Sequence, residues 1–192
     1  MTTASEPSPG GRDDAVVLPL RRPPVRRSTV VASDHLHTFE VFVATIAAWW
    51  PVQPFSAGGA RVRDVTFEQR LGGRVYETWD DGSTVDWGTV LAWDPPHRFA
   101  MTWLVTGTPT EVELTFTALG PSRTLVAVEH RGWEALSDAE LSADCALPGG
   151  YSGGSVTRGW VAVLGSLAAR LGGAPAPDDP TSPDEPATLE AP

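Results

Sequence analysis

The sequence contains a single cysteine, no lysine and no long hydrophobic run. Cys145 alone cannot form a disulfide bond within the chain, which fits a reducing compartment. All 14 basic residues are arginine, a usage that we attribute to the coding bias of a high-GC bacterial genome. No apolar segment approaches the ~18 residues of a membrane-spanning helix, and the N-terminus lacks the apolar core of a signal peptide. We therefore expect a cytoplasmic protein that does not bind a membrane.

The two ends of the chain lack the apolar periodicity of folded segments. Residues 1–27 are rich in proline and arginine, and residues 172–192 are rich in proline and acidic side chains and contain no aromatic residue. Neither segment can bury enough apolar surface to offset the entropy lost on ordering. We predict a disordered basic arm over residues 1–27, one domain over residues 28–171 and a disordered acidic tail over residues 172–192.

The net charge of −10 argues against one class of partner. Nucleic-acid binding needs clustered cations that neutralise phosphates, and this chain is acidic outside its N-terminal arm. A short basic tract such as the arm is a non-specific signal and does not outweigh that balance. We expect no nucleic-acid partner.

The middle of the chain is predicted to form successive antiparallel strands. Asp80–Ser83 and Asp94–His97 carry the Asp, Gly and Pro residues of tight turns. The runs around them are rich in Val, Thr, Tyr, Phe and Trp, which suit a pleated sheet. Residues 110–118 alternate apolar and polar side chains, as in a sheet with one buried face. The predicted strands span residues 27–32, 61–70, 74–79, 85–93, 98–104, 110–118 and 123–129.

A helical region is predicted after the first strand. Ser33 or Asp34 can cap it, because a side-chain oxygen there accepts from the free amides of the first helical turn. Apolar residues then recur every three to four positions up to Trp50, and Pro51 ends the pattern. Thr45 is a candidate break, which would divide the region into two short helices.

The C-terminal helix completes the predicted fold. Residues 155–171 carry an amphipathic stripe, and Gly172-Gly173 ends it. A sheet with one apolar face needs a cover, and this helix is the long element left to provide it. The fold class is α+β: a curved antiparallel sheet of about seven strands wrapped on a long C-terminal helix, with one or two short helices after the first strand. An apolar pocket between sheet and helix is a common binding place for small molecules.

His130 is the first of two candidates for chemistry. It is expected at the end of the last strand, on the face of Val126 and Val128, where an imidazole can act as a general base or bind a ligand. The alternative is a histidine that hydrogen-bonds the backbone before Gly132. The absence of an identifiable nucleophile or second base favours this alternative.

Glu77 is the second candidate, and its role depends on the register of its strand. If the odd-numbered residues of this strand point inward, Glu77 is a buried carboxylate at a functional position. If the even-numbered residues point inward, Glu77 faces water. An ion pair with Arg74 or Arg131 is a third possibility.

The eight tryptophans are interpreted chiefly as core residues, because each buries a large apolar body. We expect two or more of them to line a pocket, with Trp87, Trp103 and Trp160 as the first choices. The predicted cavity lining consists of Trp50, Trp79, Trp87, Trp103, Val112, Leu114, Phe116, Val126, Val128, His130, Trp160 and Leu164.

No metal or cofactor site is predicted. His35 and His37 are two positions apart at a helix start and do not share a face, whereas zinc needs three or four converging ligands. The glycine-rich segment Gly149–Gly154 has no preceding strand and no following lysine, so it is not a phosphate-binding loop. We interpret it as a flexible connection and a candidate gate to the cavity.

The sequence resembles the START-like helix-grip superfamily, also called SRPBCC or Bet v-like. Within it, the sequence is most similar to the heat-shock protein 90 ATPase activator homologue family, in the form of bacterial stand-alone domains. The matching motifs run in order over about residues 28–171. They are Phe39 with Trp49-Trp50-Pro51, Gly72–Glu77, Asp81-Gly82, Trp87–Val90, Asp94–Phe99, Thr102-Trp103, His130–Trp133 and Gly159-Trp160.

The resemblance implies the helix-grip fold and leaves three functions open, because this fold hosts several unrelated activities. The first is binding of a small apolar or amphipathic ligand between the sheet and the C-terminal helix. The second is a cyclase-, aromatase- or hydrolase-like enzyme that uses His130 and Glu77 for proton transfer. The third is a protein-interaction domain that modulates a chaperone ATPase. We favour the first, with the protein as a monomer or weak dimer.

Overall fold

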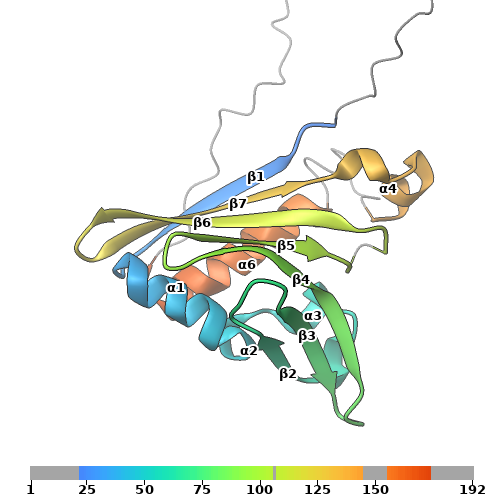
Figure 1. The fold of residues 1–192 in the computed structure, drawn as a ribbon, viewed down its shortest axis with the longest axis horizontal. Coiled ribbons are helices and arrows are strands. Elements are labelled where there is room, and N and C mark those ends of the chain that lie inside the picture. The colour runs from blue at the N-terminus through green and yellow to red at the C-terminus, as the bar shows by residue number, and fades with distance from the viewer. Residues whose placement is uncertain (1–21, 106, 145–154, 174–192) are drawn as a thin grey trace, which may run out of the picture.

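A computed structural model describes residues 22–105, 107–144 and 155–173 (Figure 1). Residues 1–21, Cys145, the Gly149–Gly154 segment and residues 174–192 lie outside the described residues. The elements are β1 (Val25–Val31), α1 (His35–Ala44), α2 (Ile46–Trp49), α3 (Val52–Phe55), η1 (Gly59–Arg61), β2 (Val62–Phe67), β3 (Arg74–Trp79), β4 (Thr84–Asp94), β5 (Arg98–Trp103), β6 (Thr110–Gly120), β7 (Arg123–Arg131), η2 (Trp133–Ala135), α4 (Asp138–Asp144) and α6 (Ser155–Arg170).

The strands form one antiparallel sheet in the order β1-β7-β6-β5-β4-β3-β2. His130 on β7 lies opposite Val25 on one side and opposite Val112 on the other, so it is inside the sheet and not at its edge. Buried and half-buried residues alternate along β6 and β7, which gives the sheet one apolar face. The predicted α+β helix-grip fold with seven strands is confirmed.

The C-terminal helix α6 lies across one side of the sheet, with α1 on the same side (Figure 1). It packs closely against β1. The helix ends where predicted: Gly172 has a φ of 74°, and the Gly173 amide donates to the Ala168 carbonyl at 2.7 Å. Its most deeply buried side chains are Val163, Leu164, Leu167 and Ala168.

The first helical region divides at Thr45, as the sequence predicted. The Asp34 carboxylate caps α1 by accepting from the His37 amide at 2.9 Å. The Thr45 hydroxyl donates to the Val41 carbonyl at 2.8 Å, in competition with the regular helix pattern, and α2 begins at the next residue. The Ser166 hydroxyl of α6 donates to the carbonyl of Trp49, which joins α6 to the end of α2.

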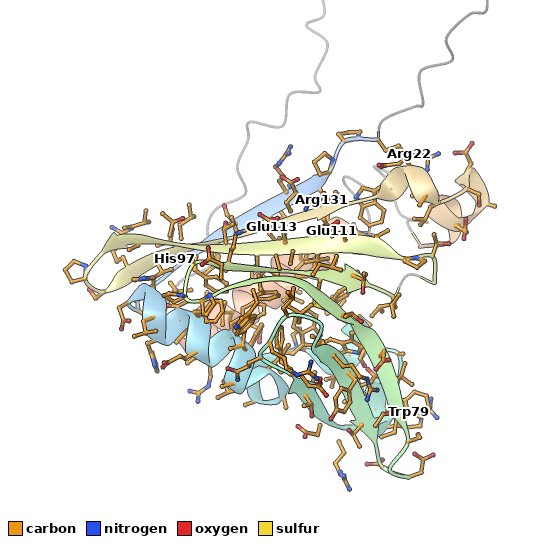
Figure 2. All side chains as sticks on the ribbon, viewed as in Figure 1. Arg22, Trp79, His97, Glu111, Glu113 and Arg131 are labelled. Carbon is orange, nitrogen blue, oxygen red and sulfur yellow. The ribbon has the colours of Figure 1, made fainter. Side chains whose placement is uncertain are left out.

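The folded domain begins before residue 28, so the predicted boundary is corrected. β1 starts at Val25, and the Arg22 guanidinium donates to the Leu136 carbonyl at 3.1 Å and to Asp138 at 2.5 Å (Figure 2). Composition alone does not indicate that this segment is folded, because it has few apolar residues. Backbone pairing with β7 and an ion pair from Arg26 to Glu129 stabilise it instead. Residues 22–27 therefore belong to the domain.

The side of the sheet turned away from α6 carries charged groups. Arg131 contacts Glu111 and lies 3.4 Å from Glu113 (Figure 2). None of the helices among the described residues has both the length and the apolar character needed to span a bilayer.

Candidate functional site

A cavity of about 350 Å³ opens between α6 and the ends of the strands that face it. Side chains from the residue after α2, the α3 turn, the ends of β5 and β7 and the N-terminal part of α6 all contribute to it. Its lining consists of Trp50, Pro54, Phe55, Trp103, Val105, His130, Val156, Gly159, Trp160 and Val163.

Trp50, Trp103 and Trp160, here called the tryptophan partition, contact one another in this cavity wall. Their ring centroids are 5.5 to 6.1 Å apart, which is the range of direct aromatic contact. A flat ligand therefore cannot insert between these rings and has to lie against one side of them. On their far side, the same three residues border a void of about 10 Å³, at the lower limit for a single water. The partition thus separates the open cavity from a filled inner core.

His130 is the titratable group of the cavity wall, with a side chain only 1% exposed. Its Nδ1 accepts from the Trp160 indole N–H at 3.1 Å, and its Nε2 lies 2.8 Å from the Thr110 hydroxyl. An indole nitrogen can only donate, so Nδ1 carries the lone pair and the neutral ring holds its proton on Nε2. The Trp133 ring packs on the imidazole at 4.3 Å.

Burial lowers the pKa of His130 from 6.5 to about 3. The imidazole is therefore neutral at physiological pH, and a proton on Nδ1 would oppose the indole N–H of Trp160. A general base works best when its pKa lies near the working pH, and here the lone pair is already occupied. This geometry suits a fixed hydrogen-bonding group better than a proton-transfer group.

Glu77 faces inward and is fully buried, which answers the question that the sequence left open. Its carboxylate accepts three N–H groups: the indole of Trp79 at 2.6 Å, the indole of Trp87 at 2.8 Å and the amide of Ala57 at 3.2 Å. An ionised carboxylate only accepts, so three donors suit it. Arg61 lies over the Trp79 ring at 3.8 Å and adds positive charge behind that donor.

Neither arginine proposed as a partner of Glu77 reaches it. Arg74 bonds to Asp86 at 2.6 Å, and Arg131 contacts Glu111 on the opposite side of the sheet. Glu77 does not line the cavity either. It acts on the cavity indirectly, because Trp87 packs against Trp50 at 5.0 Å.

Residues 52–59, here called the cover segment, form one edge of the cavity. Pro51 ends the predicted helical region, and the structure adds the single turn α3 after it. The Phe55 carbonyl accepts from the Trp50 indole at 3.0 Å, and the Ser56 hydroxyl donates to the Val52 carbonyl at 2.6 Å. The bond from Ala57 to Glu77 ties this segment to β3.

The twelve residues predicted to line a cavity occupy four places in the structure. Trp50, Trp103, His130 and Trp160 line it, while Trp87, Val112 and Leu114 border the inner void. Phe116, Val126, Val128 and Leu164 are buried in the core, and Trp79 is half-buried beside Arg61. The tryptophan partition lies between the cavity and the three residues at the inner void, since its rings border both spaces.

Six lining residues were missing from the predicted set: Pro54, Phe55, Val105, Val156, Gly159 and Val163. Val156 and Val163 share the apolar stripe of α6 with Trp160, so the helical period carried a signal for them. Phe55 and Val105 lie in irregular segments without periodicity, and no sequence pattern marks them.

The histidines near α1 do not gather a metal-binding set. His35 stacks on His97 of the β4–β5 turn, with ring centroids 5.5 Å apart. Over residues 22–105, 107–144 and 155–173, no group of three or more His, Cys, Asp or Glu side chains is placed to share a metal ion.

Comparison with family models matches residues 39–172 to the family described as Activator of Hsp90 ATPase homolog 1-like protein. Comparison with curated proteins gives no match. Among solved structures, an anthrahydroquino-γ-pyrone synthase, Txn09, is 32% identical, with 78% of this chain and 97% of that chain covered and a TM-score of 0.50.

Two more distant structures show the fold alone. CalC from Micromonospora echinospora, a self-sacrificing resistance protein, is 23% identical, with 79% of this chain and 97% of that chain covered and a TM-score of 0.55. The Aha1 dimer from Colwellia psychrerythraea is 13% identical, with 77% and 95% covered and a TM-score of 0.52.

Proposed function

We propose that this chain, which belongs to the family of Activator of Hsp90 ATPase homolog 1-like proteins, binds an apolar or amphipathic small molecule in the cavity beside Trp160. The main observation in support is the cavity, which has a volume of about 350 Å³ and is bordered mainly by aromatic and aliphatic side chains. Ligand pockets fall in the range of roughly 300–1,000 Å³ with this type of lining. Cytoplasmic location and a monomeric or weakly dimeric state are part of the same proposal.

The electrostatics of the lining favour a ligand that is uncharged where it is buried. His130 is the only titratable side chain among the described lining residues, and its low pKa keeps it neutral. A buried ligand charge would have no partner there and would carry a large desolvation cost. Polar groups of the ligand are therefore expected at the mouth of the cavity, and its apolar part against the tryptophan partition.

The test combines native mass spectrometry with a variant that fills the cavity. Protein purified from its own host should carry a small molecule, seen as an added mass that is lost on denaturation. Val163→Phe should abolish this added mass, because residue 163 is buried and lines the cavity. Val161→Phe on the same helix is the matched control, since Val161 is 43% exposed. An equal added mass in both variants contradicts the proposal. So does a wild type that carries no added mass and also fails to bind a neutral aromatic probe, 2-naphthol, in calorimetry.

A ring-forming enzyme is the second candidate, favoured by the 32% identity to a γ-pyrone synthase over 97% of that protein. In this role the cavity would fold the substrate and exclude water, with His130 as a neutral hydrogen-bonding group. A suitable probe is a hydroxyanthraquinone with a 1,3-diketone side chain, whose phenol closes onto the far carbonyl with loss of water. Acceleration by wild type and not by Val163→Phe supports the enzyme; no acceleration contradicts it.

The same variants distinguish ligand binding from chaperone ATPase activation, the role that the family description names. Stimulation of an Hsp90 ATPase that survives Val163→Phe would favour a protein-interaction role over ligand binding.

A further inference from the structure

Glycine occurs twice in helix α6, at positions 159 and 165, although it is among the least favoured residues in a helix interior. The two positions differ in what surrounds them. A methyl group on residue 165 would meet no other atom within 4 Å. A methyl group on residue 159 would lie 3.2 Å from Cε1 and 3.4 Å from Cδ1 of Phe55. Gly159 therefore has a steric role that Gly165 lacks.

The backbone around Phe55 is held by two hydrogen bonds. The Phe55 carbonyl accepts from the Trp50 indole at 3.0 Å, and two residues later the Ala57 amide donates to the buried Glu77 at 3.2 Å. If Phe55 withdrew from α6, the geometry of these bonds would change. A side chain at position 159 therefore either projects into the cavity or presses on the ring of Phe55, whose backbone these bonds hold.

Gly159 also exposes bare helix backbone to the cavity, next in sequence to Trp160, whose indole ring lines the same cavity. We propose that the contact of Gly159 with Phe55 determines the size of the ligand that the cavity admits, and that the ligand is a flat fused-ring molecule lying against this backbone. This inference rests on the proposed ligand-binding function. It assigns a specificity role to a residue without a functional group.

Calorimetry on the full chain tests the proposal with two neutral probes, 2-naphthol with two fused rings and 2-hydroxyanthraquinone with three. One added carbon in an apolar pocket changes binding by about 10- to 200-fold when the fit is close. Gly159→Ala should weaken binding of the three-ring probe by about tenfold or more and affect the two-ring probe much less. Gly165→Ala is the control: it gives the same gain in helix propensity and should leave the affinities for both probes unchanged.

A second readout needs no ligand. The indole N–H of Trp50 donates to the Phe55 carbonyl, so its proton resonance should shift in Gly159→Ala and stay in place in Gly165→Ala. An unchanged resonance shows that Phe55 does not respond to position 159 and overturns the steric argument. Equal affinity of wild type and Gly159→Ala for the three-ring probe overturns the size selection and leaves the proposed function standing. If neither probe binds wild type, this inference fails; the proposed function fails with it only if protein purified from its host also carries no small molecule.

Discussion

Acid should destabilise this protein through His130, over a pH range set by its shifted pKa. The folded-state pKa is about 3, against 6.5 for an ordinary histidine. Between these values the unfolded chain binds a proton that the folded chain refuses, so stability falls as the pH falls. Each pH unit is worth about 1.4 kcal/mol, so the loss is about 3 kcal/mol at about pH 4 and approaches about 5 kcal/mol below the folded pKa. Above the unfolded pKa this contribution is complete and the curve is flat.

Urea unfolding of wild type and His130→Gln, from about pH 7 to about pH 4, measures this effect. Glutamine can accept from the Trp160 indole and donate to Thr110, so the fold is kept while the titratable group is removed. Carboxylates titrate in both proteins, so subtracting one stability curve from the other removes their contribution. The remaining difference should shrink with the predicted slope as the pH falls. His37→Asn is the control, because His37 is exposed, and its curve should follow the wild type. Parallel curves for wild type and His130→Gln would refute the burial argument.

Three further predictions follow from burial and hydrogen bonding. Glu77→Gln replaces one accepting carboxylate oxygen with an NH2 group, which leaves an indole N–H without its acceptor and should lower the free energy of unfolding by about 1–3 kcal/mol. The control Glu40→Gln, at an exposed residue, should change it by no more than about 0.5 kcal/mol in the same urea titration. Trp160→Ala, at a side chain 4% exposed, should cost roughly 3–5 kcal/mol, and an unchanged melting temperature would contradict its burial. Removal of residues 174–192 should leave the unfolding midpoint unchanged, as the composition of the tail predicts; loss of cooperative unfolding would contradict that.

Most of the fold could be predicted from apolar periodicity and from turn-forming residues. The strands from residue 62 onward lie where the alternation and the Asp, Gly and Pro turns placed them, and α6 ends at the predicted glycine pair. These signals are local, since each reports how one segment meets one buried face. β1 was placed two residues late, because Val25 is held by its cross-strand partner on β7, more than a hundred residues away in sequence.

The candidate site was predicted less completely, because it depends on how distant segments fill a shared space. The period of two on β6 and β7 correctly identified the inward residues, yet inward does not mean cavity-lining. Phe116 points into the interior, but Phe39 and Phe42 of α1 pack against its ring, and it does not line the cavity. Phe55 shows the opposite case: it lies in an irregular segment, yet it lines the cavity, where its carbonyl accepts from the Trp50 indole and the nearby Ala57 amide donates to Glu77.

Most of the indole N–H groups are bonded inside the protein, including those of Trp50 and Trp160 in the cavity wall. Six tryptophans donate to acceptors inside the protein: Trp49 to Val41, Trp50 to Phe55, Trp79 and Trp87 to Glu77, Trp133 to the His130 carbonyl and Trp160 to the His130 ring. Each bond fixes the angle of a ring and also removes a donor that a ligand could use. Glu77 and His130, the two buried titratable groups among the described residues, are occupied in the same way. At Trp50, Trp160 and His130 the wall therefore offers a ligand fixed ring surface and few free hydrogen-bonding groups, so affinity there should depend on the shape of the ligand more than on its hydrogen bonds.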